Sequence, residues 1–567
     1  MAVVTAEPGS AVGDRHPETE TAEPAASPEP RAHALDLPVR VAAHATVWSV
    51  VLVPSLIELA DGWRPVRDDA MLSIGSYQVF SGRSPLVGPW SLASGTHHPF
   101  FDLGPLLFWL LAVPVRLDPS HGVLWGAAVV AAVALSVAVE AARSVGGWIA
   151  AALVALAVAD LGWRTPVFTN PAWNAYFGIA VLAAAAVVAW SVACGRFGWW
   201  PVAVLFASVA AQSHLFYAVP ACLLVLVAPV IALLLGGRPT RWRWLPVGLA
   251  VAGLAWLPTI VQEIIGSPGN LTMVVRGPSA QAPVGLSFGM HALATAAAPR
   301  PIWLTDFPVV LGLARGMPRY FDAHAVLWAV VGVLLLGAVV VVARREGRSR
   351  VAALSATALV VAAGVTASFV LLPRDNLAPS GYLASVLWLV GILGWIAVVA
   401  GAAVLARAAW ARRRRPSVDR RVGPRLRPLG GLSLALVPVA LLAGATVAAV
   451  CAQVPEARAQ VANERADVPF DAALARAVER SVPSGSFALR VRPTVFPDPR
   501  SVFGAYAVDE WGTAMKLLGD GRDPALADPF AGAAVHLSVP AGQHWRTVVV
   551  TIDPATRRVA AVRVLPG

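Results

Sequence analysis

Charged side chains are scarce in this chain. Asp, Glu, Lys and Arg together make up 14% of its 567 residues, whereas hydrophobic residues make up 57%. A soluble globular protein is about 25% charged and about 45–50% apolar, so this composition excludes a soluble enzyme and a disordered chain. Cysteine is scarcer still, with three residues in all, which excludes a disulfide-stabilised scaffold. The composition that remains is typical of a protein that crosses the membrane many times.

Several sequence signatures are absent as well. The chain has no Walker motif, no HExxH motif and no glycine-rich phosphate loop, which excludes the nucleotide-binding and zinc-protease classes that depend on them. It also has no repeat with a period of 20–50 residues. A formal net charge of +11 would suggest nucleic acid in a soluble protein. Here the arginines stand at the ends of apolar runs, which indicates membrane topology, and we expect no nucleic-acid partner.

Apolar runs of membrane-spanning length follow one another along most of the chain. A helix needs about 20 apolar residues to cross a bilayer, with a range of about 17–25. The twelve candidate spans are 41–60, 99–115, 121–139, 146–162, 174–194, 199–213, 215–236, 243–262, 324–343, 351–372, 382–406 and 430–452. The sequence therefore predicts a polytopic α-helical membrane protein with about 11–13 transmembrane helices.

The orientation of these spans follows from arginine, which is enriched in short cytoplasmic loops. Three arginine-rich loops separate the later spans: Arg238 to Arg243, Arg344 to Arg350 and Arg407 to Arg427. They place the loop 263–323, and everything after about residue 453, outside the cytoplasm. We therefore expect a multi-pass protein of the plasma membrane with its C-terminal part extracytoplasmic.

The first part of the chain is rich in Ala, Pro, Glu and Thr. Residues 1–40 have no apolar period, which is typical of a disordered tail, and they lack the basic start and short apolar core of a cleaved signal peptide. We expect a cytoplasmic tail followed by a signal anchor at 41–60. Twelve spans would return the C-terminus to the cytoplasm, against the arginine pattern. One segment between 64 and 162 is therefore misassigned: either 99–115 is half-buried, or 64–96 holds a further helix.

The last part of the chain changes character. Apolar residues alternate with polar ones at 545–552 (WRTVVVTI) and at 559–565, a pattern that favours strands. We expect a small extracytoplasmic α/β domain that binds or packs rather than reacts, because it shows no nucleophile–base pair. The predicted division is a tail at 1–40, a transmembrane domain at 41–452 with outer loops 61–98 and 263–323, and an outer domain at 453–567.

The first outer loop carries two adjacent carboxylates, Asp68 and Asp69, in the stretch DGWRPVRDDAMLSIG. A carboxylate held near the bilayer often marks a functional site, and a carboxylate can deprotonate an acceptor hydroxyl as a general base. The alternative is a solvated loop with a surface pair between Arg67 and Asp68, which would contribute little.

Two histidines end the same loop, at His97 and His98, just before Pro99. Histidine can bind phosphate, ligate a metal or transfer protons. The alternative is a polar turn with a proline in the first turn of the next helix. Their spacing matches no known set of metal ligands.

Other polar residues lie at the predicted outer ends of helices. His214, in the stretch QSHLFY, is an ionisable group near the membrane and therefore a candidate for a site; the alternative is a neutral histidine bonded to a nearby carbonyl. Arg276 follows a Gly- and Pro-rich turn and could hold a phosphate, or be a surface arginine. The polar loop from Thr169 to Asn174, with its aromatic residues, is typical of the belt at a membrane interface.

These features together resemble a known class of enzymes. The order of an acidic pair (Arg67-Asp68-Asp69-Ala) and then His98-Pro99-Phe100 at the start of a helix resembles the membrane-embedded glycosyltransferases of the GT-C class. That class includes protein O-mannosyltransferases and aminoarabinose transferases. The run from Trp256-Leu-Pro through Gln262-Glu263 to Ser267-Pro-Gly-Asn270-Leu looks like that of actinobacterial members. The likeness covers roughly residues 41–280.

The resemblance implies the chemistry. Such enzymes take a sugar from a polyprenyl-phosphate donor and pass it to a lipid, glycan or protein hydroxyl of the cell envelope. It implies that Asp68 or Asp69 is the catalytic base, and that Arg67, Arg83 or Arg276 meets the donor phosphate. The predicted substrate-binding residues are Arg67, Arg83, His97, His98, His214, Asn270 and Arg276. Some members use a divalent metal, for which His97, His98 and His214 could converge, although the sequence identifies no ligand set.

Two other classes compete with this interpretation. A transporter or flippase of a lipid-linked envelope precursor would also have many helices, but it would be expected to show polar groups in mid-membrane and a two-fold internal repeat. A structural scaffold could use the outer domain to bind cell-wall glycan. The acidic loop favours the enzyme, because neither alternative requires it.

Overall fold

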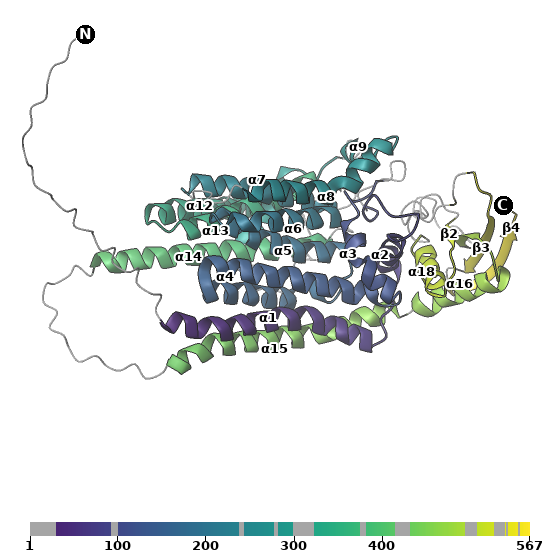
Figure 1. The fold of residues 1–567 in the computed structure, drawn as a ribbon, viewed down its shortest axis with the longest axis horizontal. Coiled ribbons are helices and arrows are strands. Elements are labelled where there is room, and N and C mark those ends of the chain that lie inside the picture. The colour runs from purple at the N-terminus through teal and green to yellow at the C-terminus, as the bar shows by residue number, and fades with distance from the viewer. Residues whose placement is uncertain are drawn as a thin grey trace, which may run out of the picture.

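The structure is a computed structural model that combines a long helical bundle with a small domain at one end (Figure 1). The residues that it describes are 30–91, 100–236, 243–276, 282–298, 323–374, 381–413, 431–465, 467–493, 507–526, 539, 542–553 and 556–566. Most of the predicted N-terminal tail lies outside the described residues, as do His97 and His98 of the predicted site.

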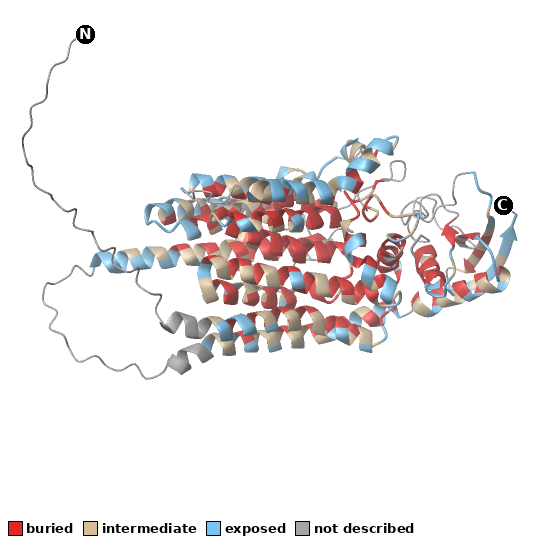
Figure 2. Cartoon of the chain, viewed as in Figure 1, coloured by how far each residue is buried: buried red, intermediate tan, exposed pale blue. Residues whose placement is uncertain are grey.

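The long helices form the bundle. They are α1 (Pro30–Ala60), α4 (Gly122–Arg164), α5 (Asn174–Ala193), α6 (Trp200–Ser213), α7 (Ala218–Leu234), α8 (Trp244–Ile265), α12 (Ala323–Arg345), α13 (Ser349–Leu371), α14 (Val386–Arg413) and α15 (Gly431–Glu464). Small residues, alanine above all, fill the contacts between them, which lets helices approach closely. Large apolar residues such as Leu226, Leu254 and Ile264 are exposed on the outside. Figure 2 shows this arrangement, with buried residues inside the bundle and exposed ones along its outer helices, as expected for a bundle surrounded by lipid.

Helix α4 is two crossings rather than one. A straight helix of its 43 residues would be about 65 Å long, about twice the hydrocarbon core of a bilayer. The backbone at Gly147 has φ 65° and ψ −157°, which is not helical. Arg143 pairs with Asp36 near the start of α1 at 3.0 Å, whereas Gly162 approaches Val50 further along α1. The chain therefore reverses at Gly147, which agrees with the separate predictions for 121–139 and 146–162.

The run 99–115 is not a crossing, which agrees with the first of the two alternatives given for the segment 64–162. Helix α3 occupies only Leu106–Leu117, about 18 Å of helix, which is too short to cross. The residues before it form a loop in which Phe101 bridges to Trp90, and Pro105 stands directly before the helix. The apolar composition of this run therefore reflects burial at one end of the bundle, against α2 (Arg67–Gln78) and α4.

The number of crossings follows from these two observations. Nine helices in the described part of the chain are long and apolar enough to cross a membrane, with α4 counted once. The second arm of α4 brings the crossings there to ten, and α6 together with the 3₁₀ turns on either side of it, Phe197–Trp199 and Leu215–Tyr217, brings them to eleven. This segment joins Trp199, bonded to Ser144 near the turn of α4, to His214 at the other end. This count lies within the predicted range and is odd, as the arginine pattern requires.

The two ends of the bundle differ. Arginines gather at one end, which we call the arginine end: Arg344 and Arg345 end α12, and Arg412, near the end of α14, bonds to Glu346 at 3.3 Å. The opposite end, the domain end, carries α2, α3, α9 (Asn270–Arg276) and the small domain (Figure 1). Helix α10 (Leu286–Ala297) packs against α12, α13 and α14.

The small domain contains a four-stranded sheet. Its elements are α16 (Asp467–Ser481), β1 (Phe487–Pro493), α18 (Ala507–Gly519), β2 (Ala525–Leu526), β3 (Arg546–Asp553) and β4 (Arg558–Leu565). The strand order is β2-β1-β3-β4, with β4 antiparallel to β3 and the other pairs parallel. The predicted strands 545–552 and 559–565 are confirmed. Helix α15 runs unbroken to Glu464, so the domain begins after this helix rather than at residue 453.

The first helix also extends beyond its predicted bounds. Helix α1 begins at Pro30, before the predicted end of the tail at residue 40, and a proline is well suited to the first turn of a helix. Asp36 pairs with Arg143 of α4 at 3.0 Å, and Arg40 pairs with Glu140 of α4 at 2.6 Å. These ion pairs hold this part of α1 against α4 at the arginine end.

Candidate functional site

A cavity of about 650 Å³ lies at the domain end of the bundle. Three segments form its walls: the start of α2, the end of α4 with the loop that follows it, and the last turns of α15. Its lining brings together carboxylates, amides, aromatic rings and arginine, a combination that suits a polar ligand with an apolar face.

The predicted acidic pair lies in this cavity. Asp68 and Asp69 occupy the first turn of α2, where the helix dipole favours negative charge. Asp69 is buried, with 4% of its surface exposed, and Asp68 is half-buried. Arg67, directly before them, has a positive φ of 52°, a conformation that is uncommon for a residue other than glycine. The backbone at the start of α2 is therefore held in an unusual shape next to the two carboxylates.

The two carboxyl groups have different surroundings. Burial raises the pKa of Asp69 well above its ordinary value, and the nearby carboxylates of Glu464 and Asp68 raise it further. Burial also raises the pKa of Asp68, but a hydrogen bond from the Trp173 side chain and the charge of Arg67 both act to lower it. Asp68 is therefore the more readily ionised member of the pair.

The end of α4 and the loop after it form an aromatic wall of the cavity. The ring of Trp173 meets Tyr176 edge to face, with centroids 4.9 Å apart, and the guanidinium of Arg164 lies over the ring of Trp163 at 4.5 Å. Thr169 and Asn170 belong to the same wall. The loop 169–174, predicted as part of an interfacial belt, thus lines the cavity.

Helix α15 supplies a stripe of polar side chains that the sequence prediction missed. Gln453, Glu456, Gln460 and Glu464 recur at intervals of three and four residues, so they share one face of the helix, and all four line the cavity. The Gln460 amide donates to Glu464 at 2.5 Å. Gln453 is 2% exposed, and neither its Nε2 nor its Oε1 has a hydrogen-bond partner in the described part of the chain.

This stripe has a signal in the sequence. Its spacing is that of a helix, and it directly continues a predicted span. The prediction ended the span at 452 and gave the polar residues to a soluble domain, which hid the pattern.

A further carboxylate, Glu58 of α1, lies close to Asp69. It is 1% exposed, and neither of its carboxyl oxygens has a hydrogen-bond partner among the residues that the structure describes. Its charge interacts with those of Asp69 and Glu464. Four carboxyl groups therefore crowd one region of the domain end.

His214 lies outside the cavity lining and has a structural setting. Its Nδ1 accepts a hydrogen bond from the backbone of Phe216, and its Nε2 lies 3.1 Å from the hydroxyl of Tyr382. Next to it, the buried carboxylate of Asp102 accepts from the backbone of Leu215 at 2.8 Å and from the amide of Asn174 at 3.2 Å. These bonds fasten the loop before α3 to the ends of α5 and α6.

The structure gives Asn270 a role within the protein. Its Oδ1 accepts from the backbone of Phe101 at 2.9 Å, and its Nδ2 donates to the carbonyl of the same residue at 3.1 Å. The carboxylate of Glu263 accepts from the backbone of Leu271 at 2.8 Å and so caps α9. Asn270 and Arg276 both lie outside the cavity lining, so the structure does not bring them together with the acidic pair.

The remaining predicted arginines contact the small domain. Arg67 pairs with Asp467 at 2.9 Å, and Arg83 pairs with Asp523 at 3.4 Å and lies over the ring of Trp545. Arg67 still borders the cavity, whereas Arg83 does not. Arg164, which does border it, was not among the predicted residues.

A metal site stays a prediction. Within the described ranges, no group of three or more His, Cys, Asp and Glu side chains is arranged to hold a metal ion. His97 and His98 lie outside those ranges, and His214 is bonded as described.

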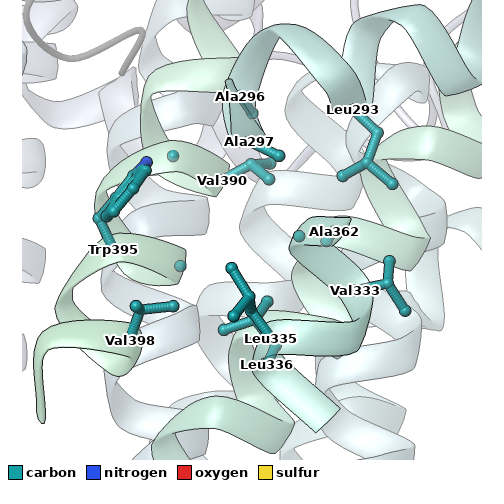
Figure 3. Close-up of a pocket in the computed structure, with 13 residues that line it drawn as sticks. Leu293, Ala296, Ala297, Val333, Leu335, Leu336, Ala362, Val390, Trp395 and Val398 are labelled. Atoms are coloured by element: carbon teal, nitrogen blue, oxygen red, sulfur yellow. The ribbon is translucent and has the colours of Figure 1, made fainter. Parts of the chain in front are cut away.

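A second, smaller cavity of about 50 Å³ lies among α10, α12, α13 and α14. Figure 3 shows the apolar side chains that surround it, with Leu293 and Ala297 on one side and Leu336 and Val398 on another. Trp395 has the only polar side-chain atom in its lining. This cavity has no group that could transfer a proton, so the acidic cavity is the candidate site.

The fold and the site define a polytopic helical membrane protein with an acidic, aromatic-walled cavity beside a small domain. No family model and no curated protein matches the chain. Among solved structures it is similar to ArnT from Cupriavidus metallidurans bound to undecaprenyl phosphate, at 16% identity over 92% of this chain and 93% of that one, with a TM-score of 0.46. The apo state of that protein gives a TM-score of 0.47 at 16% identity, over 89% of this chain and 92% of that one. The archaeal oligosaccharyltransferase AglB from Archaeoglobus fulgidus, in complex with an inhibitory peptide and a dolichol-phosphate, gives 0.33 at 13% identity, over 89% and 69%.

Proposed function

We propose that this protein transfers a sugar, a hexose or a pentose, from a polyprenyl-phosphate donor to a hydroxyl of an envelope glycan, lipid or protein. The observation that carries the proposal is the acidic pair at the first turn of α2, placed in a cavity of about 650 Å³ whose other walls are aromatic and amide side chains. Aromatic rings can stack on a sugar ring, and amides can donate to and accept from its hydroxyls. The resemblance of the sequence to GT-C glycosyltransferases supports the same chemistry.

The position of the cavity fits a lipid-linked donor. Arginine-rich ends of helices face the cytoplasm, so the arginine end is assigned to the cytoplasm and the domain end to the outside. The cavity then lies near the headgroup level of the outer leaflet, where the phosphate of a polyprenyl donor resides. The N-terminus is cytoplasmic and the small domain extracytoplasmic in this orientation.

Asp68 is the proposed catalytic base. Its carboxylate takes the proton of the acceptor hydroxyl as that oxygen forms a bond to the anomeric carbon of the sugar. The bond from this carbon to the phosphate oxygen breaks, and the electron pair leaves with the polyprenyl phosphate. Arg164 is the proposed cation for the phosphate, because a guanidinium can bind two of its oxygens. Asp69 stays protonated and avoids a second negative charge beside the phosphate.

A transporter would need polar groups along a path through the bundle. Among the described residues, the buried carboxyl groups Glu58, Asp69, Asp102 and Glu464 gather at the domain end, which favours the enzyme. A divalent metal remains a predicted cofactor, and no step of the proposed reaction passes through it. Assays with and without a chelator, followed by added Mg²⁺ or Mn²⁺, would test that requirement.

The decisive experiment measures sugar transfer by purified protein from a panel of polyprenyl-phosphate sugars to an envelope extract. Asp68→Asn should lower kcat by about 10²–10⁴-fold, the usual contribution of a general base. The matched control is Asp61→Asn, which removes a carboxylate from the same loop outside the cavity and leaves transfer near the wild-type rate. Transfer that survives Asp68→Asn unchanged would remove the proposed base, and the absence of transfer from every donor would contradict the proposal.

A further inference from the structure

The small domain touches the base-bearing helix at its first residue. Arg67 forms an ion pair with Asp467 of α16 at 2.9 Å, and Asp467 has 6% of its side chain exposed. The same carboxylate also pairs with Arg557, from the turn between β3 and β4. One buried carboxylate is thus shared by two arginines, one from the transmembrane domain and one from the small domain.

Both arginines that pair with Asp467 have an unusual backbone conformation. Arg67 has φ 52° and Arg557 has φ 49°, and they are the only residues other than glycine with positive φ among those that the structure describes. Such a conformation persists where surrounding contacts fix it. Both arginines meet at Asp467, so the ion pairs and the unusual backbone belong to one arrangement.

Further contacts hold the same helix. Helix α18 packs against α2, and Arg557 also pairs with Asp509 of α18 at 3.3 Å. At the other side of the junction, Arg465 donates to the carbonyl of Asp61 at 3.2 Å. The start of α2 is therefore enclosed by the small domain and its linker, whereas Asp68 and Asp69 project into the cavity one and two residues later.

We infer that Asp467 is a positioning residue through which the small domain sets the place of Asp68 and Asp69. This inference rests on the proposed function, because it assigns the domain a task in the same reaction. The domain touches no substrate in this role. It acts through Arg67, whose backbone leads directly into the two carboxylates, and a shift of about 1 Å in a catalytic group can cost about 100-fold in rate.

The test compares two ion pairs that join the same two domains. Asp467→Asn keeps the size of the side chain and removes its charge. Asp523→Asn makes the same change in the ion pair between Arg83 and Asp523. This pair lies outside the cavity, and the side chain of Asp523 is 68% exposed. Hydrogen–deuterium exchange of the full-length protein reports on α2 directly and requires no substrate.

Asp467→Asn should speed exchange of the α2 amides several-fold and lower kcat at least tenfold, with donor KM changed less than twofold. Asp523→Asn should change none of these. If the two variants behave alike in α2 exchange and in kcat, the inference is overturned. If wild-type protein transfers no sugar, the proposed function fails and exchange in α2 still decides whether the domain positions the helix.

A second variant guards against unfolding of the small domain. Arg67→Gln removes the link to the transmembrane domain and leaves the pair between Asp467 and Arg557 intact. Its β1 and β3 amides should exchange as in wild type, whereas its α2 amides should exchange faster. Unchanged α2 exchange in Arg67→Gln would overturn the inference even if Asp467→Asn fails to fold.

Discussion

The indole of Trp173 donates a hydrogen bond to the carboxylate of Asp68. The same ring lies against Tyr382, with ring centroids 4.3 Å apart, and Tyr382 bonds to His214. Trp173 therefore links the acidic pair on α2 to the segment just before α14. Its position is set by a tilted ring contact on one side and by a carboxylate acceptor on the other.

Replacing Trp173 by Phe should move the acid limb of the pH–rate profile to higher pH. The hydrogen bond favours the ionised form of Asp68 and lowers its pKa, so its loss raises the pKa and protonates more of the base at low pH. A hydrogen bond to a charged group contributes about 1.5–3 kcal/mol, so we expect at least a tenfold loss of kcat/KM at pH 5 and a smaller loss at pH 8. Steady-state transfer rates across this range would measure it.

Trp163→Phe is the comparison for that variant. Trp163 lines the same cavity and stacks on Arg164, yet it does not bond to Asp68. Its acid limb should stay in place even if its rate changes. Equal displacement of the limb in both variants would show that cavity shape, rather than the hydrogen bond, controls the titration.

Asp69→Asn should stabilise the protein at neutral pH. The pKa of Asp69 is raised on folding, so the native state holds its proton more tightly than the unfolded chain. Stability is therefore greatest at low pH and falls as the pH rises above the ordinary range of an aspartate. Asparagine carries no charge in either state and removes this loss. The thermal midpoint of the variant should exceed that of wild type at pH 8 and approach it at pH 4.

The control for this prediction is Asp61→Asn. Asp61 pairs with Arg458 at 3.6 Å on the surface, where an ion pair contributes about 0–1 kcal/mol. Its midpoint should differ little from wild type at either pH. A lower midpoint for Asp69→Asn at pH 8 would contradict the assignment of a raised pKa to Asp69.

Asn270→Ala should destabilise the protein without a specific effect on donor binding. Its side chain is buried and bonds to both the N–H and the carbonyl of Phe101, and leaving such groups unpaired costs about 1–3 kcal/mol. The midpoint should fall by several degrees, whereas Arg276→Ala, on an exposed side chain, should change stability by about 0.5 kcal/mol or less. A stable Asn270→Ala protein with a raised donor KM would instead support the predicted role in substrate binding.

The sequence indicates the bundle well because membrane crossing depends on local composition. Apolar length located the spans, and arginine gave their orientation. The run 99–115 misled this reasoning, since a buried loop at the end of a bundle can be as apolar as a span. The acidic pair could also be found, because charge beside hydrocarbon is rare.

Long-range partners explain what the sequence could not provide. Asn270 bonds to Phe101, which lies 169 residues earlier. No local sequence pattern therefore distinguishes an asparagine that holds a loop in place from one that binds substrate. The pairing of Arg67 with Asp467 likewise depends on how the small domain sits on the bundle. Arg164 became a candidate only when the reversal at Gly147 placed the end of α4 beside α2.

Gln453 offers a direct test of substrate contact in the cavity. Its amide is buried and lines the cavity, and no described residue forms a hydrogen bond to either of its polar atoms. An unpaired buried amide destabilises a fold, so Gln453→Met, which keeps the shape and removes both polar atoms, should leave the thermal midpoint unchanged or raise it. If the amide meets a sugar hydroxyl, the same variant should raise donor KM about tenfold, since a neutral hydrogen bond contributes about 0.5–1.5 kcal/mol.

Gln460→Met is the matched comparison on the same face of α15: it breaks the bond to Glu464 and should lower the midpoint. If the midpoint rises in Gln453→Met and falls in Gln460→Met, and donor KM rises in Gln453→Met, then Gln453 serves substrate binding and Gln460 serves the fold. An unchanged KM in Gln453→Met would remove Gln453 from the sugar site.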